Sequence, residues 1–169
     1  MRDHFKMFAA YNGWANRKVY TAAAKLSDSQ WKQDCGVFFG SMMGTLNHIL
    51  VGDMIWMKRL TGEGEVPNRL DVAPYEEYNT LLAARRAMDD RIIDFCKTVS
   101  EDRLAAEFTY ARVTDPTPVT QPFAQALAHL FNHQTHHRGH AHAILTQLTG
   151  EAPSLDLIYY QREARQKQA

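Results

Sequence analysis

The chain has 169 residues, of which 45% are hydrophobic and 22% charged, as expected for one soluble domain over residues 1–169 with a substantial core. Its 19 lysines and arginines equal its 19 aspartates and glutamates, so no excess positive charge exists to neutralise nucleic-acid phosphates. Because no apolar run reaches the roughly 20 residues of a membrane span, and the N-terminus lacks the apolar centre of a signal peptide, we expect a cytoplasmic protein without nucleic-acid or membrane partners.

The first part of the chain predicts two long helices and a connection. Apolar residues at helical spacing predict the first helix over residues 3–25. The second is predicted over 41–60, and Ser41 is a plausible N-cap for it. In the connection of residues 30–40, Phe38 and Phe39 are expected to anchor the chain to the core rather than to form a site.

The predicted helix over 41–60 is apolar on most sides, so we expect it to be deeply packed. His48 lies off its most apolar stripe, but a buried imidazole there would still need a partner. That partner is either a metal ion or a hydrogen bond from a neighbouring helix. Asp53 is the nearest carboxylate in sequence, yet it lies about 140° round the helix from His48. We expect it to pack against Trp56 or to pair with another helix.

A loop over residues 61–73 precedes a third helix, predicted over 74–98 by apolar residues at helical spacing. Residues 107–120 carry two prolines and alternating side chains, which predict an extended excursion or a hairpin that could fold over a site as a lid. The charged face of the third helix is interpreted as solvated; it comprises Arg85, Arg86, Asp89, Asp90 and Asp94.

The segment over residues 122–150 predicts one long amphipathic helix. Thr120 is a plausible N-cap, Pro122 suits the first turn, and Gly150 followed by Pro153 predicts the end. At about 100° per residue, one apolar stripe comprises Phe123, Ala126, Leu127, Leu130, Ala141, Ile144, Leu145 and Leu148. Six of the eight histidines lie in the same segment: His129, His133, His136, His137, His140 and His142.

Two of these histidines point toward the core. His137 lies inside the apolar stripe and His133 at its edge, roughly 40° and 80° from its centre. Because residues four apart lie on successive turns of one face, this pair can hold one transition metal. His129, His136 and His140 lie further round the flank. His129/His133 and His136/His140 have the same spacing, and histidines that are packed and hydrogen-bonded without a metal remain the alternative.

The tail over residues 154–169 predicts a short helix that docks through Leu155, Leu157, Ile158 and Tyr159. Four long helices with connections of various lengths favour an all-α fold, the four-helix bundle. Facing helices in such bundles project ligands inward, so metal sites in the core are common.

Several stretches of the chain resemble the DinB family: YNGWANRKVY at residues 11–20, SMMGTLNHILVGDMIW at 41–56, NHQTHHRGH at 132–140 and GEAPSLDL at 150–157. The resemblance covers nearly the whole chain in the same order and spacing. It implies a DinB/YfiT-like four-helix bundle in an up-down-down-up arrangement with a long crossover, here with a short C-terminal extension.

The metal site of the DinB family implies three ligands in this chain. They are His48 on the second helix and the pair His133 and His137 on the last. The helical wheel also selects His133 and His137, whereas His48 rests mainly on the resemblance. The family commonly has glutamine at the position of His140. We expect His140 to tune the rim of the site, or to bind metal adventitiously, and not to be a ligand.

Three neutral imidazoles leave a coordination position open, as in catalytic zinc sites. Nitrogen ligands suit several divalent metals, of which zinc is expected, with Ni, Fe, Mn or Cu as alternatives. Arg138 could face a substrate anion, but an inter-helix ion pair is the favoured interpretation. The sequence identifies no catalytic residue.

Three functions are compatible with these features. Some relatives activate a low-molecular-weight thiol and transfer it to an electrophile, so the resemblance implies a metal-dependent thiol transferase in stress or detoxification. The alternative is a non-catalytic metal-binding stress protein or sensor, favoured by the lack of an evident acid–base partner. The third is an interaction module whose histidines are merely packed. Relatives are often homodimers, which implies a homodimer here as well.

Overall fold

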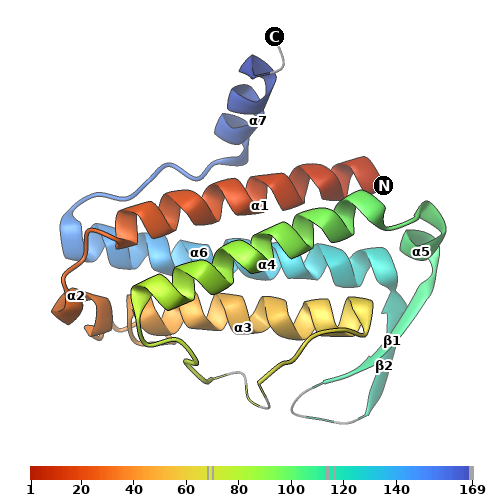
Figure 1. Ribbon diagram of the computed structural model, residues 1–169, viewed down its shortest axis with the longest axis horizontal. Coiled ribbons are helices and arrows are strands. Elements are labelled where there is room, and N and C mark those ends of the chain that lie inside the picture. The colour runs from red at the N-terminus through yellow and green to blue at the C-terminus, as the bar shows by residue number, and fades with distance from the viewer. Residues whose placement is uncertain (68, 70, 113–114, 116, 168–169) are drawn as a thin grey trace.

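The computed structural model describes residues 1–67, 69, 71–112, 115 and 117–167. In this part of the chain, four long helices run side by side (Figure 1): α1 (Arg2–Ala23), α3 (Met42–Thr61), α4 (Tyr78–Thr98) and α6 (Phe123–Thr149). The shorter elements are α2 (Asp28–Lys32), α5 (Glu101–Ala105), β1 (Glu107–Ala111), β2 (Pro118–Pro122) and α7 (Leu157–Gln166). Some residues of the two expected connections, 68 and 70 in one and 113, 114 and 116 in the other, lie outside the described residues, as do 168 and 169 of the tail.

The long helices follow the up-down-down-up arrangement. In Figure 1, α1 and α6 run from right to left, whereas α3 and α4 both run from left to right. The chain between α3 and α4 therefore crosses back along the length of the bundle. Each of α1 and α3 packs against both α4 and α6, so the helices form a closed ring of neighbours. The predicted all-α fold is confirmed.

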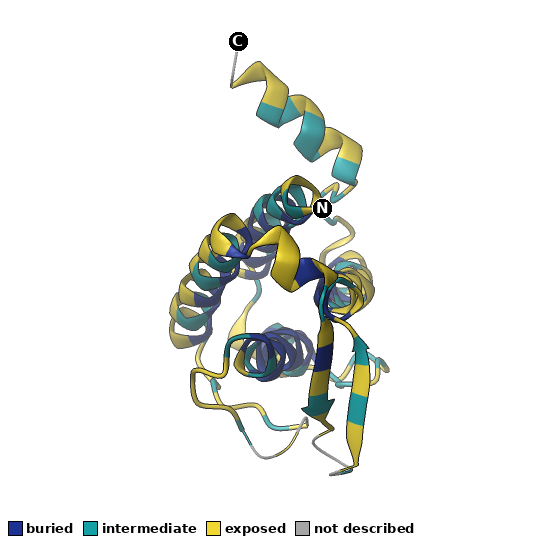
Figure 2. Cartoon of the chain, turned by 90° about the vertical axis from the view of Figure 1, so that its right-hand side faces the viewer, coloured by how far each residue is buried: buried dark blue, intermediate teal, exposed yellow. Residues whose placement is uncertain are grey.

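The core lies between the four long helices, whose buried faces point inward (Figure 2). Burial of this apolar surface is the main force that holds the helices together. The predicted apolar stripe of α6 is buried from Phe123 to Leu145, and only Leu148, near the end of the helix, is half-buried. None of the described helices is long and apolar enough to cross a membrane.

The predicted N-cap of α3 at Ser41 and the predicted end of α6 at Gly150 are both confirmed. The side chain of Ser41 caps α3 by accepting a hydrogen bond from the backbone N–H of Gly44 at 3.1 Å. At the C-terminal end of α3, Gly62 adopts the left-handed conformation with φ of 80°. Gly150 ends α6 in the same way with φ of 78°. These conformations favour glycine, because a Cβ atom would be strained there.

The expected N-cap of α6 is wrong. Thr120 lies in β2, where its hydroxyl pairs with that of Thr109 across the hairpin at 2.8 Å. The helix begins directly after Pro122, which has no side-chain capping bond. Pairing of β1 with β2 thus decides the role of Thr120, and the predicted hairpin is confirmed for its described residues.

α4 begins at Tyr78, four residues later than expected from Pro74. The Asn47 side chain accepts a hydrogen bond from the backbone N–H of Tyr75 at 3.0 Å and donates one to its carbonyl at 2.8 Å. Trp31 donates its indole N–H to the backbone carbonyl of Glu76 at 3.0 Å. These bonds from α3 and α2 hold the segment in a non-helical conformation, a constraint that local propensity does not contain.

The C-terminal helix α7 stands away from the bundle and contacts α1 (Figure 1). Leu155 and Leu157 pack against aromatic side chains of α1, as expected. The expected docking of Ile158 and Tyr159 is wrong, since these side chains are 49% and 44% exposed. Tyr160 docks instead on the rings of α1, because it lies one turn after Leu157 on the same face.

Candidate metal centre

The predicted ligands His48, His133 and His137 lie together between α3 and α6. The Nε2 atom of His48 is 3.2 Å from the Nε2 atom of His133 and 3.2 Å from that of His137. The three rings offer ligand atoms that all lie within 4.8 Å of one another. His48 is buried, whereas His133 and His137 are partly exposed, so the cluster opens toward the α6 side.

The spacing of these nitrogens fits a bound cation. Zinc–nitrogen bonds of about 2.0–2.1 Å in a tetrahedron place neighbouring nitrogens about 3.3–3.4 Å apart, close to the observed 3.2 Å. A ring nitrogen of a neutral histidine donates or accepts one hydrogen bond. Hydrogen bonding can therefore satisfy only one of the two contacts that the His48 Nε2 atom makes. A cation between the rings would bind all three lone pairs at once.

Gly52 on α3 provides the space for the His133 ring. A Cβ atom added at Gly52 would lie 2.6 Å from Cε1 and 3.1 Å from Nδ1 of His133. Such distances are shorter than van der Waals contact, so the ring would have to move. Glycine at this position thus lets α6 bring the His133 ring against the backbone of α3.

We expect Gly52→Ala to weaken metal binding at least tenfold, because a displaced His133 can no longer meet the other two rings. Equilibrium dialysis with elemental analysis measures this change. The matched control is Gly139→Ala on α6, where an added Cβ atom meets nothing within 4 Å. That control should retain the metal and gain about 0.5–1 kcal/mol from helix propensity alone. Equal affinities of the two variants would contradict the role assigned to Gly52.

An aromatic ring that the sequence assigned to the core covers one side of the cluster. The Phe39 ring stacks on His48 with ring centroids 3.7 Å apart and an angle of 17° between the planes. It also lies 5.5 Å from the His137 ring. Gly44 permits this approach, since a Cβ atom there would collide with the Phe39 carbonyl oxygen. The expectation for Phe38 is wrong, because that side chain is 86% exposed.

The expected lid is not formed by the described residues of the hairpin. Tyr110 of β1 packs on Trp56, with ring centroids 5.2 Å apart, and Phe108 packs on Phe123. Trp56 lies eight residues after His48, or about 12 Å along α3. The aromatic cover of the histidine cluster therefore comes from Phe39.

Comparison with known proteins agrees with this architecture. The sequence model of the DinB family matches residues 1–168. The chain belongs to the DinB family. It is 24% identical over 151 residues to Protein DinB of Bacillus subtilis (strain 168), covering 85% of this chain and 84% of that relative. The crystal structure of a DinB-like protein from Bacillus cereus ATCC 10987 shares its fold, with a TM-score of 0.62 and 17% identity over 83% of this chain and 89% of that one.

In this DinB-family protein, burial lowers the pKa of two of the candidate ligands, His133 and His137. Burial and the neighbouring His48 ring lower the pKa of His133 to about 4. Burial and the rings of His133 and His48 lower the pKa of His137 to about 3. Both rings therefore keep their lone pairs free at neutral pH, as metal ligation requires.

The lowered pKa values predict how the stability of the metal-free protein depends on pH. Unfolded histidines take up protons as pH falls through about 6.5, whereas His133 and His137 in the folded chain do so only near pH 4 and 3. Stability from these neutral rings is thus present above pH 6.5 and lost progressively below it. Thermal unfolding followed by circular dichroism should show a melting temperature that falls from pH 7 to pH 5. In a His133→Ala, His137→Ala double variant the fall should be smaller, and an unchanged fall would contradict this account.

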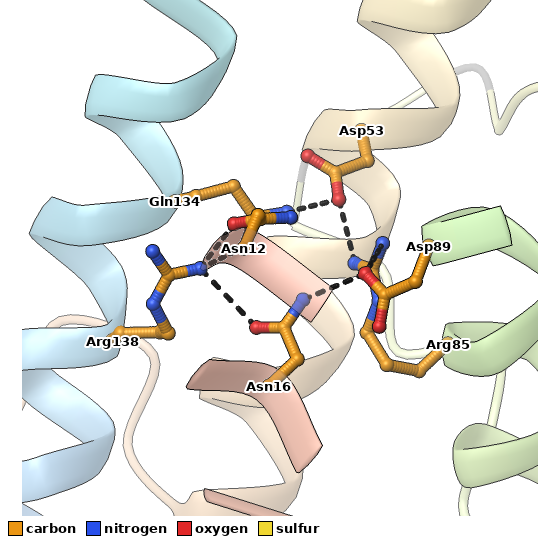
Figure 3. A network of polar contacts seen from close by, with 7 residues as sticks. All are labelled: Asn12, Asn16, Asp53, Arg85, Asp89, Gln134 and Arg138. Atoms are coloured by element: carbon orange, nitrogen blue, oxygen red, sulfur yellow. Dashed lines mark hydrogen bonds and ion pairs between the residues drawn. The ribbon is translucent and has the colours of Figure 1, made fainter. Parts of the chain in front are cut away.

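A buried polar layer lies beside the histidine cluster and joins all four long helices (Figure 3). Arg85 of α4 donates to Asp53 of α3 at 2.6 Å and pairs with Asp89 at 3.0 Å. Asn16 of α1 donates to Asp89 at 2.9 Å. The prediction that Arg85 and Asp89 face solvent is wrong, because partners from α1 and α3 make their burial possible. The other residues of that face, Arg86, Asp90 and Asp94, are exposed as predicted.

Arg138 is 2% exposed and belongs to the same polar layer. Its Nη1 atom donates to the side-chain oxygens of Gln134 at 3.0 Å, Asn16 at 3.2 Å and Asn12. Its Nη2 atom donates to the Thr135 hydroxyl at 3.3 Å. These partners are amides and a hydroxyl, not the carboxylate that the expected ion pair requires. Gln134 donates in turn to Asp53 of α3. Since Gln134 and Arg138 directly follow the two candidate ligands of α6, these bonds hold that helix in the rotation that turns both ligands toward His48.

The other histidines of α6 lie outside the group of His48, His133 and His137, called the inner cluster below. The His129 ring packs on Trp56 with centroids 4.9 Å apart. His136 and His140 flank His137, with ring centroids 4.7 and 5.3 Å from it. His140 thus lies at the rim, where we expected it.

Neither cysteine of the protein is placed as a nucleophile. Cys96 is buried in the core, and burial raises the pKa of its thiol to about 12. Burial also raises the pKa of the Cys35 thiol above its ordinary value. Both are free thiols. A thiolate is the reactive form, so thiol chemistry at this site requires a thiol from outside the chain.

Proposed function

We propose that this chain is a metal-dependent transferase that joins a low-molecular-weight thiol to an electrophilic small molecule in stress or detoxification. The observation that supports it most is the meeting of three imidazole nitrogens, with Nε2 of His48 3.2 Å from the other two. Three protein ligands leave a coordination position for a reactant. A divalent cation held there would supply the positive charge that deprotonates a coordinated thiol.

The residues around the histidine cluster cover one side of it and leave the other partly exposed. Phe39 covers the His48 side and leaves the partly exposed side of α6 for entry. The buried bonds of Gln134 and Arg138 keep the two ligands of α6 in a fixed orientation. Such preorganisation lowers the cost of bringing reactants together. The neutral, nitrogen-only ligand set suits zinc, with Ni, Fe, Mn and Cu as alternatives.

A non-catalytic metal-binding stress protein is the alternative. It is favoured by the absence of an available base among the described residues nearest in sequence. Asp53, the carboxylate nearest to His48 in sequence, already accepts hydrogen bonds from Arg85 and Gln134. Thiol transfer needs no such base, because the cation itself lowers the pKa of the thiol. For that reason we prefer the transferase. We also propose that the protein acts as a homodimer, for which the exposed Ile158 and Tyr159 of α7 are candidate contacts.

The transferase is tested by thiol consumption with 1-chloro-2,4-dinitrobenzene and a panel of low-molecular-weight thiols, using untagged protein. The zinc-loaded protein should accelerate the reaction of at least one thiol above the rate with free zinc. Chelation or His137→Ala should remove this acceleration, while His142→Ala, outside the cluster, should retain it. Equal rates before and after chelation would contradict the transferase. Stoichiometric metal without acceleration of any thiol would favour the non-catalytic alternative.

A further inference from the structure

A second group of histidines lies on the solvent side of α6, beside the inner cluster. His136, His137 and His140 each offer a ring nitrogen, and these atoms lie within 4.8 Å of one another. His136 and His140 are one turn apart, with ring centroids separated by 4.8 Å. His136 is exposed and His140 half-buried, so this rim group is accessible to ions in solution.

Two nitrogens of the rim group are buried without a hydrogen bond. The Nδ1 atoms of His137 and His140 are shielded from solvent, and neither has a hydrogen-bond partner in the described part of the chain. The other nitrogen of His137, Nε2, lies toward His48 in the inner cluster. Buried polar atoms without partners are uncommon in folded proteins, because each costs free energy. Because each of these two rings offers a nitrogen to the rim group, a cation bound there is a candidate partner for the Nδ1 atoms.

We propose that His136, His140 and the Nδ1 atom of His137 form a second binding site for a divalent transition metal, at the rim of the inner cluster. Three imidazoles without carboxylates favour late first-row cations, with Cu(II) bound more tightly than Zn(II). Water fills the remaining positions, since the rim is open to solvent. This site does not depend on the proposed thiol transfer.

The two sites share one ring, so they affect each other. A neutral imidazole carries a single N–H, which lies on Nδ1 when Nε2 binds a metal. His137 then offers no lone pair to the rim, and His136 and His140 hold the rim cation. His136 and His140 have no such conflict. The rim cation is therefore held more weakly than the inner one when both sites are filled.

The test is equilibrium dialysis of untagged, metal-stripped protein against Zn(II) alone and Cu(II) alone, followed by elemental analysis. The wild-type protein should bind two equivalents, the first more tightly. His136→Ala and His140→Ala should each lose the weaker equivalent and retain the tight one. His48→Ala should lose the tight equivalent and retain rim binding. His142→Ala, a histidine of the same helix outside both groups, should behave as the wild type.

Spectroscopy of the Cu(II)-loaded protein adds a second readout. With Zn(II) in the inner site, the electron paramagnetic resonance spectrum of added Cu(II) should show nitrogen coupling that is lost in a His136→Ala, His140→Ala double variant. A single equivalent in the wild type would overturn the proposal. A second equivalent that survives in the double variant would also overturn it. So would a second equivalent that His142→Ala removes as fully as the rim variants do, because binding would then come from surface imidazoles in general.

Discussion

His137→Ala should lose the tightly bound metal while keeping its helix content. The His137 Nε2 atom is one of the three that meet between α3 and α6. Changes to residues that merely support metal ligands cost about 10–100-fold in affinity, so removal of a ligand should cost at least about 100-fold. The fold should persist, because His137 is only partly buried and the apolar stripe of α6 is unchanged. Elemental analysis and far-ultraviolet circular dichroism measure the two effects.

The matched control for this prediction is His142→Ala, which removes an imidazole from the same helix outside the cluster. It should retain metal in the same ratio as the wild-type protein. Stoichiometric, tightly bound metal in His137→Ala would contradict the assignment of the three ligands. Loss of helix content along with the metal would instead show that His137 has a structural role.

Asp53→Ala should lower the free energy of unfolding by about 3–5 kcal/mol, the cost of breaking a buried ion pair from one side. Asp53 and Arg85 are each 1% exposed and lie 2.6 Å apart. Without Asp53, the guanidinium of Arg85 keeps only Asp89 as a buried carboxylate partner, and Gln134 loses its acceptor. Urea unfolding followed by circular dichroism measures the change.

The matched control is Asp94→Ala, which removes a carboxylate from an exposed pair. Asp94 accepts from Lys97 at 2.9 Å, and both side chains are more than half exposed. Exposed pairs contribute about 0–1 kcal/mol, so this variant should unfold almost as the wild-type protein does. Similar losses in the two variants would contradict the importance of the buried layer. Because that layer also orients α6, Asp53→Ala should weaken metal binding, although Asp53 does not belong to the metal cluster.

Local sequence was sufficient to predict the long helices and part of the site. The apolar stripe of α6 and the αL glycine at Gly150 depend on residues close together in the chain, so periodicity and turn chemistry predict them. The same stripe selects His133 and His137. It could not select His48, because α3 is apolar on most sides and His48 lies off its most apolar stripe. That residue followed from the resemblance to the DinB family.

The polar layer and the aromatic cover could not be predicted in this way. Arg85 and Asp89 have the spacing of a solvated helix face, and their burial depends on partners from α1 and α3 that are distant in sequence. Adjacent aromatics also give no local reason why Phe39 stacks on His48 while Phe38 is exposed. A helical wheel describes the faces of a single helix. The burial of Arg85 and Asp89 and the stacking of Phe39 depend on contacts between different helices and connections.

The most direct test is elemental analysis of untagged protein that has never touched nickel resin, beside a His48→Ala variant. His48 is the residue that links α3 to the two candidate ligands of α6. A three-histidine site predicts one tightly held divalent metal per chain in the wild-type protein and its loss in the variant. No tightly held metal in the wild-type protein, or the same content in both proteins, would contradict it.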